Sequence, residues 1–499
     1  MKRKTVIALG VSALLVVALL AGIHSGDLPT GVEGEWKWPK ISASSSLLWL
    51  LVSAAGVAAY GGYAALGFRA LGVPSRRGVR EIGWVVGLTA SAVAVQVFIA
   101  VGAPDEYDLT RWAYVHYFRG STGYYEIARD QAAADPWKFL ADYPTWIQSQ
   151  DPFHIGTHPP GIIATHAALL AVTERHRGLT DFLNAAMPPS VTMGFRQLEA
   201  MNKRTLPRAD RAEIYLVSVL TLLLCAGTVA PLYLMAREGS PPQLAWCAAA
   251  FWPLAPALNL FQPLADAAYP FFSAGALAAG AWSARLNGTP GAAGWTAVVL
   301  GLVSGVTMAF GMMYTLAFLP VGLMVALVVL ATRSNLWSRR LKTIAWIGAG
   351  FLAFVALGWI VTGANPLVVW RWNLHHHARF YDAYHRSYWP WLFANPVETA
   401  VAMGIPAAVW CTTGAATDRR YVPRTAWCGL AVIAIANLTG RNMGEVARLW
   451  MLFLPPLLTA AGVGLTRLGG GPKAVFATVV LTGVQTLGLQ ALIQVVYPF

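Results

Sequence analysis

The sequence predicts an all-α, polytopic membrane protein with about 13 transmembrane helices. Of its 499 residues, 56% are hydrophobic and only 12% are charged, whereas about 25% charged residues is usual in soluble domains. Apolar runs of bilayer-spanning length recur along the whole chain. The net charge of +13 is spread between these runs and follows no nucleic-acid-binding motif, so no nucleic-acid partner is expected.

The first three apolar runs determine on which side of the membrane the following loop is expected. Lys2, Arg3 and Lys4 precede an apolar run over 6–23, which fits a signal anchor or a cleavable signal peptide. Runs over 46–71 and 82–102 follow. Residues 103–212 are therefore expected on the side of the membrane opposite to the N-terminus.

The remaining spans lie downstream of that large loop. We place them near residues 213–236, 242–259, 266–284, 292–311, 314–332, 343–362, 397–413, 425–438, 449–466 and 474–496. Loops on the N-terminal side hold 18 basic and 3 acidic residues, whereas those on the other side hold 18 basic and 20 acidic. The positive-inside rule then predicts a cytoplasmic N-terminus in the plasma (inner) membrane.

We treat residues 1–499 as one transmembrane domain with two large external loops, 103–212 and 363–396. Within the first loop, the apolar stretch 161–172 is only 12 residues long, which favours a juxtamembrane or re-entrant helix over a span. The alternative is that it crosses, with a second weak crossing near 179–195.

The first external loop opens with carboxylates at the membrane boundary, namely Asp105, Glu106 and Asp108. Like charges crowded at a partly desolvated boundary raise carboxyl pKa values and suit a general base. An isolated Asp there would only mark a helix end. Three acids followed by aromatic residues, among them Tyr124 and Tyr125, favour a sugar site, because sugars stack on rings and bond to acids.

His154 and His158 flank the turn before Pro159 and Pro160 at the other end of this stretch. A Pro-Pro pair breaks a helix and fixes the direction of the preceding side chain. A histidine at this turn is therefore a ligand to phosphate or to a metal, or only a turn residue. His158 is taken as a donor-phosphate ligand and His154 as substrate-binding.

The later external segments add polar candidates. His375, His376 and His377 are consecutive, so they diverge by about 100° each on a helix and only one or two can face a ligand. Of these, His375 and His377 are taken as substrate-binding, and the neighbouring Arg371 as a donor-phosphate ligand. Asp266 is either a substrate contact or an acid at a helix start.

Arg441, Glu445 and Arg448 precede a late span. Glu445 and Arg448 are neighbours on a helix, so they form an internal ion pair or bind substrate and phosphate. Arg441 is a phosphate candidate in either case.

The order of these motifs resembles the protein O-mannosyltransferases and the lipid A aminoarabinose transferases, which belong to the GT-C superfamily of membrane glycosyltransferases. In that family an Asp-Glu pair follows a span and a His-Pro-Pro-Leu turn opens the next apolar segment. Here Asp105-Glu106, then Tyr124-Tyr125, then His158-Pro159-Pro160-Gly161 stand in that order. The Asp that often precedes the turn is replaced by Thr157.

The resemblance implies a GT-C-like fold and inverting transfer of a sugar from a polyprenyl-phosphate donor to a lipid, glycan or protein acceptor on the outer face. Asp105 is the implied base, with Glu106 and Asp108 as second choices, and His158, Arg441, Arg448 and Arg371 stabilise the leaving phosphate. No cofactor is indicated with certainty. A divalent metal is compatible, although neither His375 with His377 nor Asp105 with Asp108 has a spacing that decides it.

The alternative is a transporter or flippase of a lipid-linked or sugar substrate. It predicts charged or broken positions near the middle of several spans, and the sequence has almost none.

Overall fold

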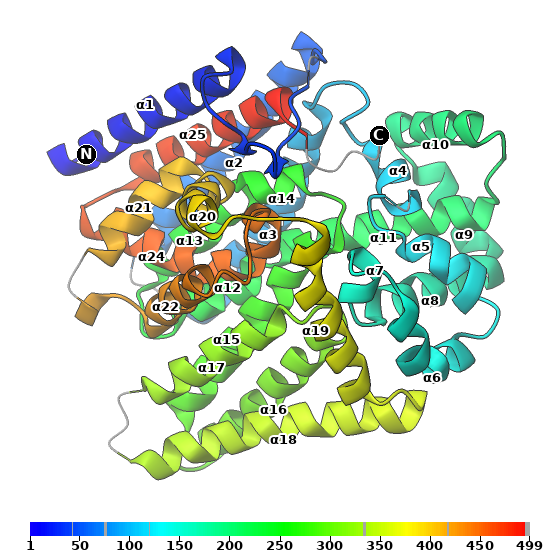
Figure 1. Cartoon of the computed structure of the whole chain (residues 1–499). Coiled ribbons are helices and arrows are strands. Elements are labelled where there is room, and N and C mark those ends of the chain that lie inside the picture. Colours follow the sequence, from blue (N-terminus) through cyan, green and yellow to red (C-terminus); the bar gives the residue numbers. More distant parts are fainter. Residues whose placement is uncertain (42, 74–76, 119, 333–335, 417–418, 495–499) are drawn as a thin grey trace.

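The computed structural model describes residues 1–41, 43–73, 77–118, 120–332, 336–416 and 419–494. Almost all regular structure within these ranges is helical (Figure 1), which confirms the all-α fold class. Arg76, Arg333 and Asp418, which enter the charge count above, lie outside the described residues, as does the end of the span placed at 474–496.

The N-terminal part consists of three long helices and a small hairpin. Its elements are α1 (Arg3–Ser25), β1 (Gly31–Val32), β2 (Trp36–Lys37), α2 (Leu47–Leu71) and α3 (Arg77–Val101). β1 and β2 pair antiparallel, with Val32 opposite Trp36. The hairpin turn carries Glu35, whose carboxylate accepts hydrogen bonds from the Ser387 N–H at 3.0 Å and the Trp391 indole N–H at 2.6 Å. The loop between α1 and α2 is thereby attached to residues 352 and 356 positions later.

Short helices follow between residues 111 and 202. They are α4 (Arg111–Tyr117), α5 (Tyr124–Ile127), the π-helix η1 (Ala128–Ala132), α6 (Pro136–Trp146), η2 (Ile147–Ser149), α7 (His154–Thr157), α8 (Gly161–Arg175), α9 (Arg177–Ala186) and α10 (Pro189–Asn202). In Figure 1 most of them gather at the right of the molecule, away from the N-terminus. α8 has 15 residues, about 22 Å of helix, against the roughly 30 Å of a bilayer core.

The rest of the chain returns to longer helices. They are α11 (Arg208–Gly227), α12 (Val229–Arg237), α13 (Pro242–Phe251), η3 (Trp252–Leu254), α14 (Pro256–Leu260), η4 (Ala265–Ala267), α15 (Tyr269–Leu286), α16 (Ala292–Met312), α17 (Phe318–Leu330), α18 (Trp337–Thr362), α19 (Pro366–Ala383), α20 (Tyr388–Met403), α21 (Ile405–Ala415), η5 (Arg419–Tyr421), α22 (Arg424–Leu438), α23 (Val446–Leu449), η6 (Met451–Phe453), α24 (Leu454–Arg467) and α25 (Pro472–Leu492).

Seven helical segments in the described ranges are long and apolar enough to cross a membrane: Arg3–Ser25, Leu47–Leu71, Gly78–Val101, Arg208–Arg237, Ala292–Met312, Trp337–Thr362 and Pro472–Leu492. The bent pair α20 and α21 raises the number to eight if it counts as one span. Every apolar run predicted above coincides with a helix or a group of consecutive helices. Most of the difference from about 13 arises where those helices are short or broken, as over 242–259, where Pro253 lies in η3 and Pro256 begins α14. The 18-residue helix α15 is also outside the seven.

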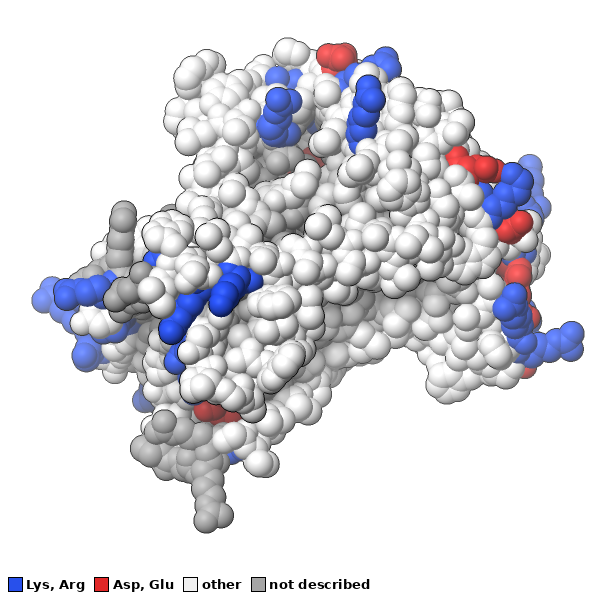
Figure 2. Space-filling model, turned by 90° about the horizontal axis from the view of Figure 1, so that it is seen from below, with Lys and Arg blue, Asp and Glu red and all other residues white. Residues whose placement is uncertain are grey.

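The surface charges agree with a membrane protein. Figure 2 shows Lys and Arg side chains gathered at the left end and basic and acidic side chains intermingled at the right end. The broad surface between them is uncharged, apart from further charged side chains at the top of the view. An uncharged belt between two charged ends is the surface that a bilayer requires.

Candidate active site

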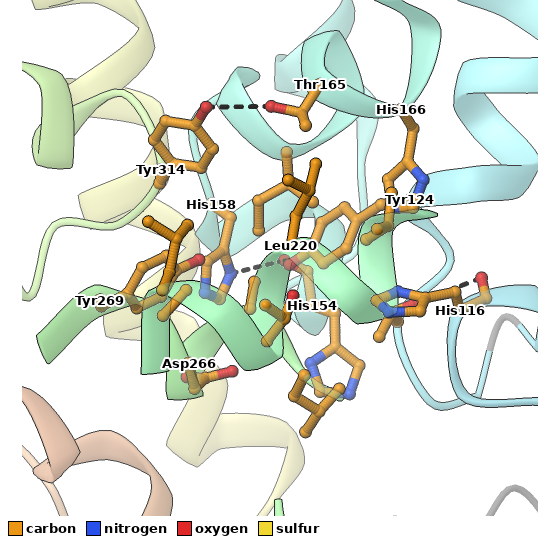
Figure 3. Close-up of a pocket in the computed structure, with 18 of the residues that line it drawn as sticks. His116, Tyr124, His154, His158, Thr165, His166, Leu220, Asp266, Tyr269 and Tyr314 are labelled. Carbon is orange, nitrogen blue, oxygen red and sulfur yellow. Dashed lines mark hydrogen bonds between the residues drawn. The ribbon is translucent and has the colours of Figure 1, made fainter. Parts of the chain in front are cut away.

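A cavity of about 190 Å³ lies where the short helices meet the long ones (Figure 3). Its polar lining comes from α4, α5, α7, α8, η4 and α23, and its apolar lining mainly from α11, α15 and α16. The polar residues include His116, Tyr124, His154, His158, Thr165, His166, Asp266, Tyr269, Tyr314 and Arg448. Residues separated by more than 300 positions in the sequence therefore share one space.

The turn before α8 fixes two histidines at this cavity. The Nδ1–H of His158 donates to the His154 carbonyl at 2.8 Å, so the lone pair of a neutral His158 ring lies on Nε2. Burial lowers the pKa of His158 to about 4, and the nearby Arg448 charge acts in the same direction. The Tyr124 hydroxyl donates to the same His154 carbonyl at 3.2 Å. His158 is thus held neutral near pH 7, with one ring nitrogen available to a ligand.

Gly161 explains how closely this turn packs against α16. Its N–H donates to the Met313 carbonyl at 2.8 Å, and a Cβ at position 161 would lie 2.4 Å from that carbonyl oxygen. A side chain would separate α8 from the end of α16. The Thr165 and Tyr314 hydroxyls, 2.9 Å apart, join the same two helices one turn further on.

Arg448 is the cation at the cavity. Its guanidinium donates to Glu445 at 3.0 Å, and Glu445 also lies 3.7 Å from Arg386. The ion pair expected between Glu445 and Arg448 is present, and Arg448 lines the cavity as well. The internal ion pair does not remove Arg448 from the cavity lining.

Asp266 is the acid in the cavity lining. It shares this lining with Arg448 and with the phenol rings of Tyr124 and Tyr269. A carboxyl group that lines a cavity together with a cation can exchange a proton with a bound hydroxyl group.

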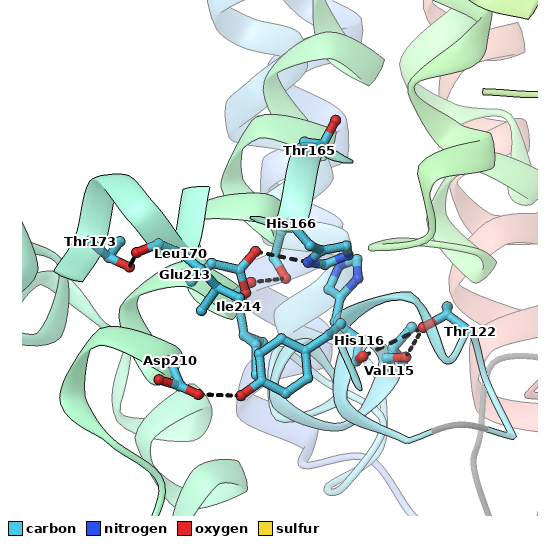
Figure 4. Close-up of polar contacts among 12 residues, drawn as sticks. Val115, His116, Thr122, Thr165, His166, Leu170, Thr173, Asp210, Glu213 and Ile214 are labelled. Atoms are coloured by element: carbon cyan, nitrogen blue, oxygen red, sulfur yellow. Dashed lines mark hydrogen bonds and ion pairs between the residues drawn. The ribbon is translucent and has the colours of Figure 1, made fainter. Parts of the chain in front are cut away.

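His166 and His116 form another part of the wall, and His166 is paired with the buried Glu213 behind it (Figure 4). The Nδ1–H of His166 donates to Glu213 Oε1 at 2.8 Å, and the two side chains are 1% and 0% exposed. The His116 ring stands 5.5 Å from the His166 ring, centroid to centroid. Nε2 of His116 and Nε2 of His166 both lack a partner among the described residues. Because a carboxylate orients His166, its Nε2 is an acceptor for a ligand hydroxyl.

Apolar side chains complete the cavity. Leu220 and Leu224 come from α11, and Phe272 and Phe310 come from α15 and α16 with ring centroids 5.1 Å apart. These helices are among the long ones of the molecule. The cavity therefore joins a charged, hydrogen-bonding wall to an apolar wall.

The three acids of the first loop lie elsewhere. Asp105 and Glu106 are exposed and do not line the cavity. Glu106 has a φ of 75°, in the left-handed region that few side chains adopt. Asp108 Oδ1 accepts a hydrogen bond from the Thr110 N–H at 2.8 Å and another from the Thr110 hydroxyl, which shapes the turn into α4.

Tyr125, in contrast to Tyr124, is absent from the lining. Its hydroxyl donates to Asp210 Oδ2 at 2.5 Å, and Arg129 Nε lies 3.2 Å from the same oxygen. Arg129 also bonds to Glu174. This network joins α5 and η1 to α8 and α11, so the two adjacent tyrosines have different surroundings.

The three consecutive histidines in α19 also have different surroundings. His376 is buried and its Nε2–H donates to the Ile147 carbonyl at 2.9 Å. Arg371, His375 and His377 are exposed, as is Arg441, and none of the four lines the cavity. The middle histidine therefore fixes α19 against η2, and the outer two stand on the surface.

The structure adds His116, His166, Glu213 and Tyr269 to the candidates. His166 and Glu213 were not singled out from the sequence, although one signal was present, since ionisable residues inside or beside an apolar run are rare unless they are functional or paired. Their pairing across 47 positions had no sequence signature. Within the described ranges, no group of three or more His, Cys, Asp or Glu residues could hold a metal ion.

Comparisons with known proteins were made for the whole chain. No protein-family model and no curated protein matches it. Among solved structures it is similar to an oligosaccharyltransferase of Archaeoglobus fulgidus, crystallised with a disulfide-tethered acceptor peptide that contains the NVT sequon, at a TM-score of 0.36 and 15% sequence identity. That alignment covers 80% of this chain and 55% of the other, so the chain spans about half the length of that protein.

Proposed function

We propose that this chain is a GT-C-like membrane glycosyltransferase that moves a sugar from a polyprenyl-phosphate donor to an acceptor hydroxyl, with inversion at the anomeric carbon. The observation that carries the proposal is the composition of one cavity. Arg448, Asp266, His158 and the rings of Tyr124 and Tyr269 line it together. Such a site offers a cation for phosphate, an acid for proton transfer and aromatic faces for a sugar.

The apolar wall supports a lipid-linked donor. Leu220, Leu224 and Phe272 lie on long helices beside the polar residues, so an isoprenoid chain can follow these helices while its phosphate reaches Arg448. Charge that develops on the leaving phosphate is stabilised by a fixed cation. The neutral His158 ring beside it offers a hydrogen-bonding nitrogen.

In the proposed reaction a carboxylate takes the proton of the acceptor hydroxyl. The oxygen then attacks the anomeric carbon as the bond to the phosphate oxygen breaks, and the electron pair leaves with the lipid phosphate. Asp105 is the base implied by the family resemblance, whereas Asp266 is the acid that lines the cavity. We assign the role to Asp266 by its position and retain Asp105 as the competing assignment.

The proposal places the cavity on the outer face of the plasma membrane, with the N-terminus in the cytoplasm. The mixed charges of residues 103–212 and the basic loops near the opposite helix ends support this orientation. A lipid, glycan or protein acceptor would then reach the site from outside.

The test is transfer of a labelled sugar from a polyprenyl-phosphate donor by the purified, full-length protein. Asp266→Asn is expected to lower transfer by at least 10³-fold with an unchanged unfolding midpoint, while Asp105→Asn retains most activity. Loss in Asp105→Asn alone reassigns the base. If intact donor crosses vesicle membranes and neither the parent nor any variant releases sugar, the transporter alternative is favoured over the enzyme.

A further inference from the structure

One buried ionisable pair at the cavity takes no part in the proposed reaction. His166 and Glu213 are joined at 2.8 Å, and their side chains are 1% and 0% exposed. Apolar residues in place of a buried pair of this kind often leave a protein equally stable or make it more stable. Stability alone therefore does not account for the pair, and its position at the cavity points to a role with a ligand.

His166 faces the cavity from α8. Four residues of this helix line the cavity, namely Ile162, Thr165, His166 and Leu169. Their spacing of three and four positions places them on one face of the helix. Glu213, on α11, is not among the lining residues. The Nδ1 edge of the His166 ring is thus turned to Glu213, and Nε2 lies on the opposite edge.

The His166 ring is braced by its neighbours and still has a nitrogen to offer. Its centroid lies 5.5 Å from that of His116 and 6.3 Å from that of Tyr125, both at T-shaped angles. The Tyr125 hydroxyl is itself fixed by Asp210 at 2.5 Å. Nε2 of His166 has no hydrogen-bond partner within the described ranges. Because buried polar atoms are normally hydrogen-bonded, this nitrogen is a contact point for a ligand.

The hydrogen bond to Glu213 determines which chemical group fits this nitrogen. When a carboxylate takes the Nδ1–H of an imidazole, Nε2 of the neutral ring carries the lone pair and needs a ligand that donates. A sugar hydroxyl can donate, whereas the oxygens of an ionised phosphate only accept. Figure 3 shows His166 on the side of the cavity away from Asp266, the base of the proposed reaction. The hydroxyl at His166 is therefore distinct from the one that reacts.

We propose that Nε2 of His166 accepts a hydrogen bond from a sugar hydroxyl that does not react, and that Glu213 holds the ring in the tautomer and direction that this contact requires. His166 is then a substrate-binding residue and Glu213 a positioning residue. The proposal rests on the proposed function, because it names a contact of the sugar in the same cavity. The contact orients the sugar ring while the lipid phosphate reaches Arg448.

The experiment compares two substitutions of one histidine in the full-length protein in nanodiscs. An Asn side chain places its amide group near the position of Nδ1, and a Gln side chain places its amide group near the position of Nε2. His166→Asn therefore keeps the contact with Glu213 and loses the contact with the ligand, whereas His166→Gln does the reverse. The matched control is His176→Asn, at an exposed histidine. The probes are polyprenyl phosphate and its mannose, glucose and galactose esters, with binding read by native mass spectrometry.

We expect the parent to bind at least one of the three sugar lipids more tightly than polyprenyl phosphate. His166→Asn should reduce this preference by about tenfold, the effect of one hydrogen bond to a buried group, and should leave the affinity for polyprenyl phosphate unchanged. His166→Gln and His176→Asn should keep the preference. Glu213→Ala should lower it, with recovery in Glu213→Gln, because an amide oxygen still accepts the Nδ1–H of His166.

A second series adds a methyl hexoside to protein that holds polyprenyl phosphate, and so distinguishes a sugar acceptor from the donor sugar. A dependence on Nε2 in this series alone assigns the contact to the acceptor. The inference is overturned if His166→Asn behaves as the parent in both series, if His166→Gln loses as much as His166→Asn, or if His166→Asn binds polyprenyl phosphate itself more weakly.

Two further results keep the inference separate from folding and from the proposed function. If His166→Asn does not fold, sugar lipids that lack single hydroxyl groups are measured on the parent. Loss of one hydroxyl should then reduce the preference by the same factor in the parent and by less in Glu213→Ala, and equal losses overturn the inference. Absence of sugar transfer, with the binding preference and its dependence on Nε2 intact, contradicts the proposed function and supports the contact.

Discussion

Arg448 contributes to the candidate site through the charges on either side of it. Glu445 accepts its hydrogen bond at 3.0 Å and is shared with Arg386, while Asp266 lines the same cavity. A guanidinium held by Glu445 is fixed in position before any ligand arrives. Such preorganisation is what stabilises charge in a transition state.

We predict that Arg448→Gln lowers sugar transfer by about 10²- to 10³-fold, the usual effect of removing one stabilising group. Arg448→Lys should recover part of this loss because it keeps the charge without the paired donors. Rates with a labelled polyprenyl-phosphate donor measure both. Arg441→Gln is the control at an exposed arginine predicted from the sequence to bind phosphate. An equal loss in that variant would show that phosphate is bound outside the cavity described above.

Two roles of Asp108 can be tested separately. One is the role of a catalytic base, a second choice implied by the resemblance, and the other is the hydrogen bonding that shapes the turn into α4. Its carboxylate accepts hydrogen bonds from the Thr110 N–H and hydroxyl, which an Asn side chain can also accept. We predict that Asp108→Ala lowers the free energy of unfolding by about 1 kcal/mol, whereas Asp108→Asn keeps both stability and transfer. Thermal unfolding and transfer rates measure the two effects. Normal stability without transfer in Asp108→Asn would instead make Asp108 catalytic.

At the scale of elements, α19 is placed by two buried side chains. Asn373 donates to the Gly156 carbonyl at 2.9 Å, and His376 donates to the Ile147 carbonyl at 2.9 Å. Both accepting segments belong to the stretch that carries His154 and His158. The position of α19 is therefore coupled to the turn at the cavity.

We predict that Asn373→Leu and His376→Phe each lower the free energy of unfolding by about 1–3 kcal/mol, because each leaves a buried carbonyl without its donor. His375→Ala, at the adjacent exposed position, should change it by less than about 0.5 kcal/mol. Thermal unfolding in nanodiscs and limited proteolysis near residues 363–366 provide the measurements. Equal stability of all three variants would show that these contacts do not hold α19.

The helices were predictable from the sequence because an apolar run can be recognised from residues that are neighbours in the chain. The runs over 6–23, 46–71 and 82–102 appear as α1, α2 and α3 with shifts of a few residues. The broken pair was not predictable, since the run at 397–413 contains Gly404, where α20 and α21 meet at 112°. There the Gln485 side chain accepts the Ile405 N–H at 2.7 Å, a contact between residues 80 positions apart.

At the scale of the whole molecule, the candidate site was predictable only in part. Tyr124, His154, His158, Asp266 and Arg448 were named from the sequence, and the fold brings them to one cavity. Each has a local signal, such as a proline turn or a helix boundary. Which of them converge depends on long-range packing, so Tyr125 and Tyr124 could not be told apart, and the partner of His166 could not be identified.

Because several neutral histidines are buried together, the stability of the whole molecule depends on pH. Burial lowers the pKa of His116 to about 3 and that of His158 to about 4, and it lowers the pKa of His154 as well. An unfolded histidine has a pKa of about 6.5. Below that pH the unfolded chain binds protons that the folded chain does not bind, so the free energy of unfolding falls as the pH falls.

We therefore predict that each such histidine contributes a decline in stability between pH 6.5 and about pH 4, of up to about 1.4 kcal/mol per pH unit. Burial raises the pKa of Asp210, so that carboxyl group contributes in the opposite sense, and the histidine contribution is read from the difference between variants. The unfolding midpoint, followed from pH 8 to pH 4.5 in nanodiscs, measures this decline. His158→Gln should make the curve shallower, because it removes one group that takes up a proton on unfolding, whereas His176→Gln, at an exposed position, should leave the slope unchanged. Equal slopes in the two variants would show that His158 is not held neutral by the fold.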